Sequence, residues 1–320
     1  MGKWIVLFGI ISISTCWAGE TQPFGIVIHG GAGTISPDNT DETKRQAIES
    51  KLREALDAGY RILENGGSST DAVVAAITIL EDSPLFNAGR GSVFTYDEAN
   101  EMDASIMDGA TLNAGAASGV RGVKNPILLA RAVMDKSKHV MLSGSGAVEF
   151  AKKVGLEMKD PAYFKTPNRL ESLKKMKENQ AKVDKHGTVG AVALDQHGNL
   201  SAGTSTGGMT GKRFGRIGDS PIIGAGTYAN NRQCGISCTG QGEYFIRTVV
   251  AYDVFAQMEY SGKSLEQAAN GIIQGRLKAM GAAGGLIGLD KKANPVMVFN
   301  TKGMYRGAKT SKGIDTVAMF

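Results

Sequence analysis

The stretch HGTVGAVAL, residues 186–194, marks the sharpest change of composition in this 320-residue chain. Residues 156–186 include 13 charged side chains and no glycine, whereas residues 187–242 hold 14 glycines in 56 positions. A second strand-like segment, residues 200–205, follows the turn QHGN at residues 196–199, and this pattern predicts a β-hairpin. We therefore expect a charged linker, in helix or coil, that ends where a glycine-rich sheet begins.

Thr188 begins the first strand of this hairpin. A threonine in a strand is usually structural, because its β-branched side chain suits a sheet. Gly187 before it can adopt backbone angles closed to other residues, which would bring the Thr188 hydroxyl to the preceding carbonyl. Cleavage there would give Thr188 a free α-amine, whose pKa of about 7.7–8.0 suits a general base. One residue would then carry both the nucleophile and the base of a hydrolase.

Hydrophobic periodicity places further elements on both sides of the hairpin. Helices are predicted at residues 41–63, 70–79, 147–154, 242–258 and 264–280, and one begins at Pro126. Strands are predicted at residues 24–29, 103–107, 114–120, 189–194, 200–205, 285–289 and 295–299, the last of which closes the chain. The glycines at residues 29–33 (HGGAG) predict a tight turn, which His29 would cap. Strands in hairpins and helices in separate pairs favour a layered α+β domain over alternating βαβ units.

The first residues have the pattern of a secretory signal peptide, predicted at residues 1–18. Lys3 supplies the positive start, an apolar run follows, and Cys16-Trp17-Ala18 offers small residues at the cleavage positions. A lipoprotein box with Cys16 lipidated is the alternative. No other apolar run has the length of a membrane span, so we expect an exported, soluble protein, periplasmic or secreted.

Metal and disulfide chemistry is not expected from the side chains. Cys234 and Cys238 stand four residues apart in a predicted strand, so their Cα atoms would lie about 13 Å apart, too far for a disulfide. We expect both to be buried free thiols. The four histidines are scattered and do not have the spacing of a zinc site.

Nucleic-acid and nucleotide binding are not expected either. The formal net charge is +5, of which Lys3 belongs to the predicted signal peptide, and residues 156–186 hold 8 Lys or Arg against 5 Asp or Glu. A basic excess confined to one polar segment, without a binding motif, does not indicate a nucleic-acid surface. The run GGMTGKR at residues 207–213 lacks both the spacing and the Ser/Thr of a P-loop.

Several motifs, in order along the chain, together resemble one family. They are HGGAG (29–33), PLFNAGRG (84–91), MDASIMDG (102–109), GTVGAVALD (187–195), TSTGG (204–208), GRIGDSP (215–221) and SCTG (237–240). The chain resembles the plant-type asparaginase/isoaspartyl peptidase family of N-terminal nucleophile hydrolases, over roughly residues 24–306. The resemblance implies a four-layer αββα sandwich that cuts itself between Gly187 and Thr188. It also implies hydrolysis of β-aspartyl bonds in isoaspartyl peptides and L-asparagine through a β-aspartyl ester of Thr188.

The resemblance assigns roles around the nucleophile. Thr206, on the paired strand, would orient the hydroxyl and amine of Thr188. The Thr239 hydroxyl and the Gly240 backbone N–H would form an oxyanion hole for the tetrahedral intermediate. Asn87 would help to hold the N-terminal group of the nucleophile.

Substrate and cation binding are implied in the same way. Arg216 would grip the free α-carboxylate of an aspartyl group in bidentate fashion, and Asp219 would bind its α-ammonium. The segment at residues 210–214 (TGKRF) adds basic charge beside this loop and could alter the leaving-group preference. Main-chain oxygens that would wrap a structural sodium ion belong to Leu80, Glu81, Ser83, Phe86, Ala88 and Arg90. Catalysis itself would need no cofactor.

Processing would divide the chain into a signal peptide (1–18), an α subunit (19–187, with a mobile charged linker at 156–187) and a β subunit (188–320). The resemblance implies a dimer of αβ heterodimers. A glycosylasparaginase is the nearest enzymatic alternative, although such relatives tend to carry Asp where this chain has Gly187. An exported amino-acid-binding protein would keep Arg216 and Asp219 and need no cleavage.

Overall fold

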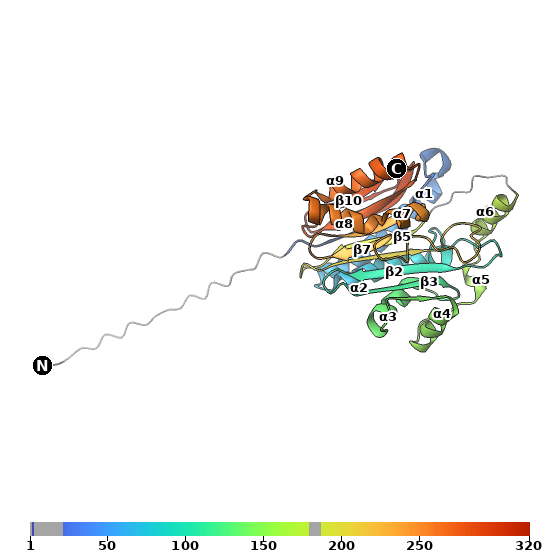
Figure 1. The fold of residues 1–320 in the computed structure, drawn as a ribbon, viewed down its shortest axis with the longest axis horizontal. Helices are drawn as coiled ribbons and strands as arrows, with labels where there is room; N and C mark the ends of the chain where they lie inside the picture. Colours follow the sequence, from blue (N-terminus) through green and yellow to red (C-terminus); the bar gives the residue numbers. More distant parts are fainter. Residues whose placement is uncertain (1, 3–21, 179–186) are drawn as a thin grey trace.

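The computed structural model describes residue 2 and residues 22–178 and 187–320. Within these residues the strands form two sheets that pack face to face, with helices on both outer faces (Figure 1). The larger sheet has the order β12-β11-β1-β5-β6-β2-β3-β4, and the smaller has the order β10-β9-β8-β7. These layers confirm the predicted α+β sandwich.

The strands of the larger sheet are β1 (Gly25–Gly33), β2 (Met102–Asp108), β3 (Ala114–Val120), β4 (Met141–Ser143), β5 (Val189–Leu194), β6 (Leu200–Thr206), β11 (Gly303–Thr310) and β12 (Asp315–Ala318). Those of the smaller sheet are β7 (Thr227–Asn230), β8 (Cys234–Gly240), β9 (Gly284–Asp290) and β10 (Pro295–Phe299). The α-helices are α1 (Glu42–Glu64), α2 (Ser69–Asp82), α3 (Pro126–Lys136), α4 (Gly144–Lys153), α5 (Pro161–Phe164), α6 (Pro167–Lys177), α7 (Gly242–Thr248), α8 (Val250–Ser261) and α9 (Leu265–Asn270).

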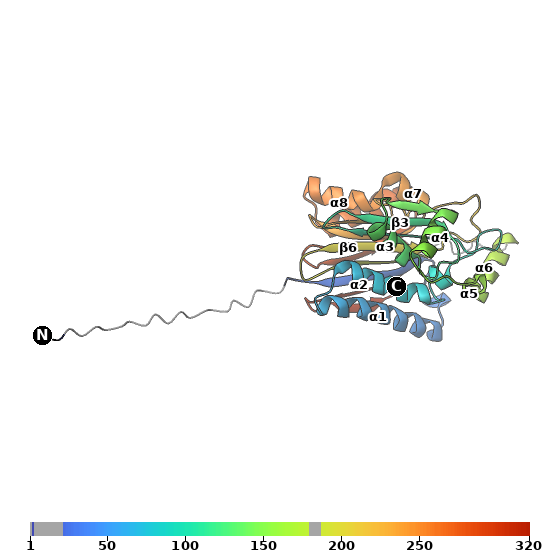
Figure 2. The same cartoon turned by 90° about the horizontal axis from the view of Figure 1, so that it is seen from below.

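Helices α1, α2 and α3 pack on the larger sheet, and Figure 2 shows α1 and α2 running side by side across it. The local sequence explains α1: the Asp41 carboxylate caps it by accepting from Lys44 N at 2.8 Å, and Leu52 and Leu56, one turn apart, are fully buried. Burying each of these leucine side chains away from water stabilises the folded protein by about 1.5–3 kcal/mol. Helices α8 and α9 pack in the same way on the smaller sheet.

The hairpin β5–β6 lies in the middle of the larger sheet, and every residue of both strands is buried. Its register pairs Val189 with Ser205 and Leu194 with Leu200. Because the pairing is antiparallel, Thr188 at the start of β5 lies opposite Thr206 at the end of β6. The predicted hairpin is confirmed, and its register alone brings two of the predicted site residues together.

The tight turn predicted at residues 29–33 is wrong, and with it the cap by His29. Strand β1 continues to Gly33, with a bulge between His29 and Gly31. Gly31 has φ +109°, and a Cβ there would lie 2.8 Å from Gly187 Cα. The glycines therefore let β1 pass close to the Gly187 backbone, which sequence periodicity could not distinguish from a turn.

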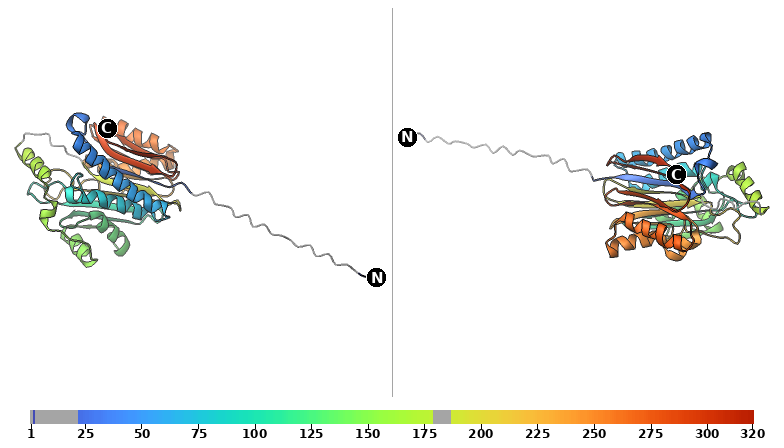
Figure 3. Two further views of the ribbon diagram at one scale, coloured as in Figure 1. Left: turned by 180° about the vertical axis from the view of Figure 1, so that it is seen from behind. Right: turned by 90° about the horizontal axis from the view of Figure 1, so that it is seen from above.

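The C-terminal half needs three corrections. The helix predicted at 242–258 is two helices, α7 and α8, because Val249 between them has the left-handed φ of +49°. The helix predicted at 264–280 begins with α9, which Ser264 and Gln267 cap, and continues as a wide π-helical segment, Gly271–Leu277. The chain does not close at residue 299: β11 pairs with β1, and β12 ends the sheet beside α1 and the C terminus (Figure 3).

Two short helices, α5 and α6, occupy about half of the segment predicted as a charged linker. Phe164 and Leu173 are buried, so this part packs on the domain. Residues 179–186 of the linker lie outside the described residues, as does the predicted signal peptide apart from Gly2. The predicted mobility of the linker stays a prediction.

Two expectations about the described part of the chain can be checked directly. Cys234 and Cys238 are buried free thiols in β8, as predicted. Among the described residues, no helix combines the length and the apolar character that a membrane span requires.

Val249 provides a test of the break between α7 and α8. A left-handed backbone destabilises a residue that has a Cβ by roughly 1–2 kcal/mol. Glycine avoids this strain but loses more conformational entropy on folding, which reduces the gain by about 0.5–1 kcal/mol. We expect Val249→Gly to raise the free energy of unfolding by about 0.5–1 kcal/mol, measured by urea denaturation. Val249→Ala keeps the Cβ and should bring no gain. A lower stability in the glycine variant would contradict this account.

Candidate active site

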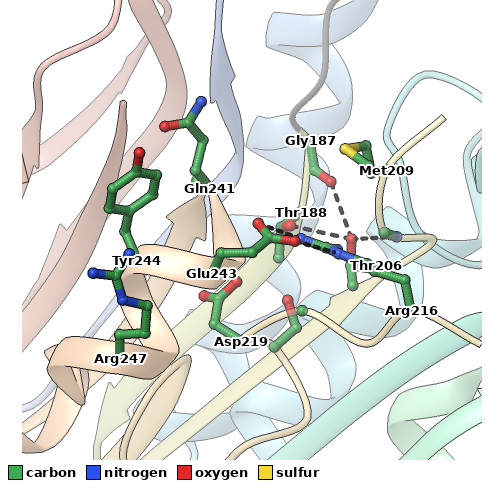
Figure 4. A pocket seen from close by; sticks show the side chains of 14 residues that line it. Gly187, Thr188, Thr206, Met209, Arg216, Asp219, Gln241, Glu243, Tyr244 and Arg247 are labelled. Carbon is green, nitrogen blue, oxygen red and sulfur yellow. Dashed lines mark hydrogen bonds and ion pairs between the residues drawn. The ribbon is translucent and has the colours of Figure 1, made fainter. Parts of the chain in front are cut away.

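A pocket of about 380 Å³ opens at the end of the β5–β6 hairpin (Figure 4). Three segments meet around it: the hairpin, the loop that follows β6, and the start of α7 with the end of β8. Its lining residues are Gly187, Thr188, Thr206, Gly208, Met209, Arg216, Gly218, Asp219, Ser220, Gly240, Gln241, Glu243, Tyr244 and Arg247. Six predicted site residues are among them: Gly187, Thr188, Thr206, Arg216, Asp219 and Gly240. Asn87 and Thr239 are buried and do not line the pocket.

The two threonines of the hairpin are hydrogen-bonded to each other beside the Gly187–Thr188 bond. Thr188 Oγ1 donates to Thr206 Oγ1 at 3.1 Å, and the Thr206 hydroxyl donates to the Gly187 carbonyl oxygen, also at 3.1 Å. Gly208 N donates to Thr206 Oγ1 at 3.0 Å. Thr206 thus accepts two hydrogen bonds and donates one, which uses its whole hydroxyl and aligns the Thr188 hydroxyl with the preceding carbonyl.

Asn87 supplies a second donor to the Gly187 carbonyl. Its Nδ2 lies 2.8 Å from Gly187 O and 2.8 Å from Gly208 O, while its Oδ1 accepts from Val93 N at 2.9 Å. Both ends of the amide are therefore fixed. With Thr206, it aims two hydrogen-bond donors at one carbonyl oxygen, an arrangement that stabilises negative charge on that oxygen.

Thr239 and Gly240, predicted as an oxyanion hole, lie at the end of β8. Gly240 lines the pocket, but Thr239 is fully buried behind it. Its Oγ1 accepts from Ala32 N at 3.3 Å, which leaves the hydroxyl hydrogen available for donation. Their predicted role therefore stays a prediction.

Arg216 and Asp219 lie together on another wall of the pocket, as the sequence predicted (Figure 4). The Arg216 guanidinium holds the Glu243 carboxylate in two hydrogen bonds, Nε to Oε1 at 2.9 Å and Nη2 to Oε2 at 3.1 Å. The site can therefore bind a carboxylate in bidentate fashion. Glu243 was missed because no sequence signal pairs the first turn of a helix with a loop residue 27 positions earlier.

Asp219 is a buried acid at the pocket. Burial is the largest influence on its carboxyl group and raises its pKa to about 7, while Arg216 lowers it and Glu243 raises it. Among the described residues its Oδ2 has no hydrogen-bond partner. A cationic group in the pocket would favour the ionised carboxylate.

The basic residues at 210–214 do not line the pocket. The Lys212 side chain is buried, with Nζ donating to Glu101 O at 2.9 Å and lying 3.8 Å from Asp103 Oδ2. Arg213 stacks on the Tyr96 ring. An effect of these charges on the leaving-group preference stays a prediction.

His29 is a second residue whose place the sequence did not reveal. Its Nδ1 donates to the Thr188 carbonyl oxygen at 2.9 Å, and its Nε2 lies 2.9 Å from Ser237 Oγ. Burial lowers the pKa of the ring to about 3, so the imidazole is neutral at physiological pH. It contacts the backbone of Thr188 and does not line the pocket.

The loop predicted to wrap a sodium ion runs from the end of α2 to the short helix Gly89–Gly91. It folds back so tightly that a Cβ on Gly91 would collide with Phe86 O, and one on Gly89 would collide with Glu81 O. The six main-chain oxygens predicted as ligands belong to this loop and its flanks, and the sodium ion stays a prediction. In the described part of the chain, no cluster of three or more His, Cys, Asp or Glu side chains could hold a metal.

Comparisons with known proteins agree on one family. The family model described as asparaginase matches residues 21–319. The isoaspartyl peptidase of Escherichia coli (strain K12) is 48% identical over 292 residues, covering 88% of this chain and 91% of the relative. The isoaspartyl peptidase/L-asparaginase of Mus musculus is 40% identical, covering 91% and 90%. The plant-type L-asparaginase of Thermococcus kodakarensis is 45% identical, covering 87% and 94%.

The raised pKa of Asp219 makes stability depend on pH. The Asp219 carboxyl group has a pKa of about 7 in the folded protein, against 3.8 in the unfolded chain. The folded protein therefore holds this proton more tightly, and the resulting stabilisation is complete below pH 3.8. This contribution is lost as pH rises to about 7 and amounts to at most about 4 kcal/mol. We expect Asp219→Asn to lose less stability than the unmodified protein between pH 5 and pH 8 in urea denaturation. Parallel curves for the two proteins would contradict the shift.

Proposed function

Since the chain belongs to the asparaginase family, we infer that it is a hydrolase that cleaves isoaspartyl peptide bonds and the side-chain amide of L-asparagine. We propose that Thr188 is its nucleophile. The observation that carries this proposal is the hydrogen-bonded arrangement of Thr188, Thr206 and the Gly187 carbonyl at the pocket.

We propose that the chain first cleaves itself at Gly187–Thr188. Thr188 Oγ1 attacks the Gly187 carbonyl carbon, and its proton reaches the Thr188 nitrogen as the C–N bond breaks. Asn87 Nδ2 and the Thr206 hydroxyl stabilise the negative charge that develops on Gly187 O. Water then hydrolyses the ester, leaving a carboxylate on Gly187 and a free α-amine on Thr188.

The free amine then serves as general base for external substrates. It accepts the Thr188 hydroxyl proton while Oγ1 attacks the side-chain carbonyl of the aspartyl group, and it passes that proton to the departing ammonia or amino acid. Gly240 N–H and the Thr239 hydroxyl would stabilise the oxyanion. Water, activated by the same amine, hydrolyses the β-aspartyl ester and restores Thr188.

Arg216 and Asp219 would select the aspartyl end of the substrate. The substrate α-carboxylate would replace Glu243 on Arg216; the Glu243 side chain is 56% exposed, so solvent weakens the pair that must be broken. The α-ammonium would bind Asp219 and favour its ionised form. A substrate with both groups free fits the two contacts, which explains selection of an aspartyl group at the end of a chain or as a free amino acid.

The remaining features belong to the same proposal. A structural sodium ion would bind the main-chain oxygens of the loop at residues 80–90, and no cofactor would take part in catalysis. The α subunit (19–187) and the β subunit (188–320) would assemble as a dimer of αβ heterodimers. Residues 1–18 would direct export to the periplasm or the medium, with lipidation of Cys16 as the alternative.

Cleavage is tested by a denaturing gel with N-terminal sequencing. The protein should separate into two fragments, the smaller beginning at Thr188, and Thr188→Ala should stay uncut and inactive. Asn87→Ala removes one of two donors to the Gly187 carbonyl and should slow cleavage by about 10²-fold. An intact wild-type chain that releases ammonia from L-asparagine would refute Thr188 as an N-terminal nucleophile.

Substrate choice is tested with the processed enzyme on β-aspartyl-leucine, L-asparagine and N4-glycosylated asparagine. We expect hydrolysis of the first two, and Arg216→Lys, which cannot form the bidentate contact, should raise KM about tenfold or more for both. Rapid hydrolysis of the glycosylated compound alone would favour the glycosylasparaginase alternative. Tight binding of asparagine without turnover would favour an amino-acid-binding protein.

A further inference from the structure

A row of buried polar side chains connects the two sheets next to the pocket. It starts at the Thr188 carbonyl oxygen, which accepts from His29 Nδ1 at 2.9 Å. His29 Nε2 lies 2.9 Å from Ser237 Oγ, and Ser237 Oγ lies 2.7 Å from Thr204 Oγ1. His29 and Thr204 belong to the larger sheet and Ser237 to the smaller, so these contacts cross the interface between them.

The row continues to the loop that carries Asp219. Thr227 Oγ1 donates to Thr204 Oγ1 at 2.6 Å, and Ser105 Oγ lies 2.7 Å from Thr227 Oγ1. Ser105 Oγ also lies 2.6 Å from the carbonyl oxygen of Ser220, the residue after Asp219. One end of the row therefore contacts the backbone of the nucleophile, and the other contacts the backbone beside the substrate-binding acid.

From Thr204 to the Thr188 carbonyl, the number of available hydrogens determines which group donates in each hydrogen bond. The Thr188 carbonyl can only accept, so His29 Nδ1 carries the ring hydrogen. The buried ring is neutral, with its pKa lowered to about 3, so Nε2 accepts and the Ser237 hydroxyl donates to it. Ser237 has then used its one hydrogen, so its 2.7 Å contact with Thr204 is a hydrogen bond that Thr204 donates; the Thr204 hydroxyl also lies 3.1 Å from the Gly226 carbonyl oxygen. Each hydroxyl thus fixes the orientation of the next group, as far as the imidazole.

The surrounding structure makes room for this row. A Cβ on Gly190, two residues after Thr188, would collide with Ser237 Oγ and His29 Nε2. The five side chains are fully buried, next to an interface that is otherwise filled by residues such as Val192 and Ile287. Replacing a buried hydrogen-bonded pair by apolar groups of the same shape can cost almost no stability, so a buried row of hydrogen-bonded side chains at this place points to a demand for fixed geometry.

We propose that His29, Ser237, Thr204, Thr227 and Ser105, which we call the hydroxyl chain, position the nucleophile. The hydroxyl chain holds the Thr188 carbonyl, and with it the Thr188 backbone and hydroxyl, at a fixed place relative to the loop that carries Asp219. None of its members lines the pocket, so they are positioning residues rather than catalytic ones. The inference rests on the proposed function of Thr188.

A pair of variants at Thr204 tests this role. Thr204→Val removes the hydroxyl at nearly constant shape, whereas Thr204→Ser keeps it. We expect Thr204→Val to lower kcat for L-asparagine, and the rate of self-cleavage, about tenfold, with KM within twofold, because the substrate contacts remain. Thr204→Ser should stay within twofold of wild type in all three. A purely structural role would lower the melting temperature of Thr204→Val and leave kcat and the cleavage rate unchanged, and that result would overturn the proposal.

A second measurement tests the proposal in the wild-type enzyme, without a substitution at any of the hydroxyl side chains. In ¹⁵N NMR spectra of the wild-type enzyme, the His29 ring, assigned by comparison with His29→Gln, should be neutral with hydrogen on Nδ1 at pH 7. The opposite tautomer or a charged ring would overturn the proposal even if Thr204→Val did not fold. Failure of the underlying function looks different: wild-type protein would stay uncut, or Thr188→Ala would retain activity.

Discussion

The backbone around Thr188 is packed so closely that three neighbouring positions have no room for a side chain. A Cβ on Gly31 would lie 2.8 Å from Gly187 Cα, and one on Gly207 would lie 2.5 Å from Asn87 Oδ1. At Gly190 it would strike His29 and Ser237. This close approach lets donors from three separate segments reach the Gly187 and Thr188 carbonyls. The site is thus built by main-chain proximity first and by side-chain chemistry second.

Burial then sets the charge of each group at this site. It keeps His29 neutral, which suits a residue that orients a carbonyl, and it raises the pKa of Asp219 to about 7. Arg216 pairs with Glu243, whose side chain is 56% exposed. Two of the charged groups in the pocket are therefore a cation with a solvent-exposed partner and an acid that gains from a cationic ligand. A zwitterionic aspartyl group complements both.

The sequence was sufficient where the signal was local. The β5–β6 hairpin follows from the strand pattern around its turn, and the pocket positions of Thr188, Thr206, Arg216 and Asp219 follow from the motifs that carry the family resemblance. The sequence was not sufficient where the structure depends on backbone that is distant in sequence. The glycines at residues 29–33 are equally compatible with a tight turn and with a strand that passes close to a second backbone segment. The pairing of Glu243 with Arg216 and the row of hydroxyls from His29 onward join strands far apart in sequence, and no single-chain pattern encodes them.

The position of α6 bears on the proposed cleavage between Gly187 and Thr188. Leu173 of this helix is buried, and Lys177 at its end pairs with Glu98 and lies over the Tyr96 ring. The helix is therefore anchored on the domain up to its last residue, independently of the Gly187–Thr188 bond. If the chain is cut as we propose, α6 can stay in place, because neither the burial of Leu173 nor the pairing of Lys177 with Glu98 involves Gly187 or Thr188. A release that moved the whole charged segment from residue 156 onward would have to break these contacts.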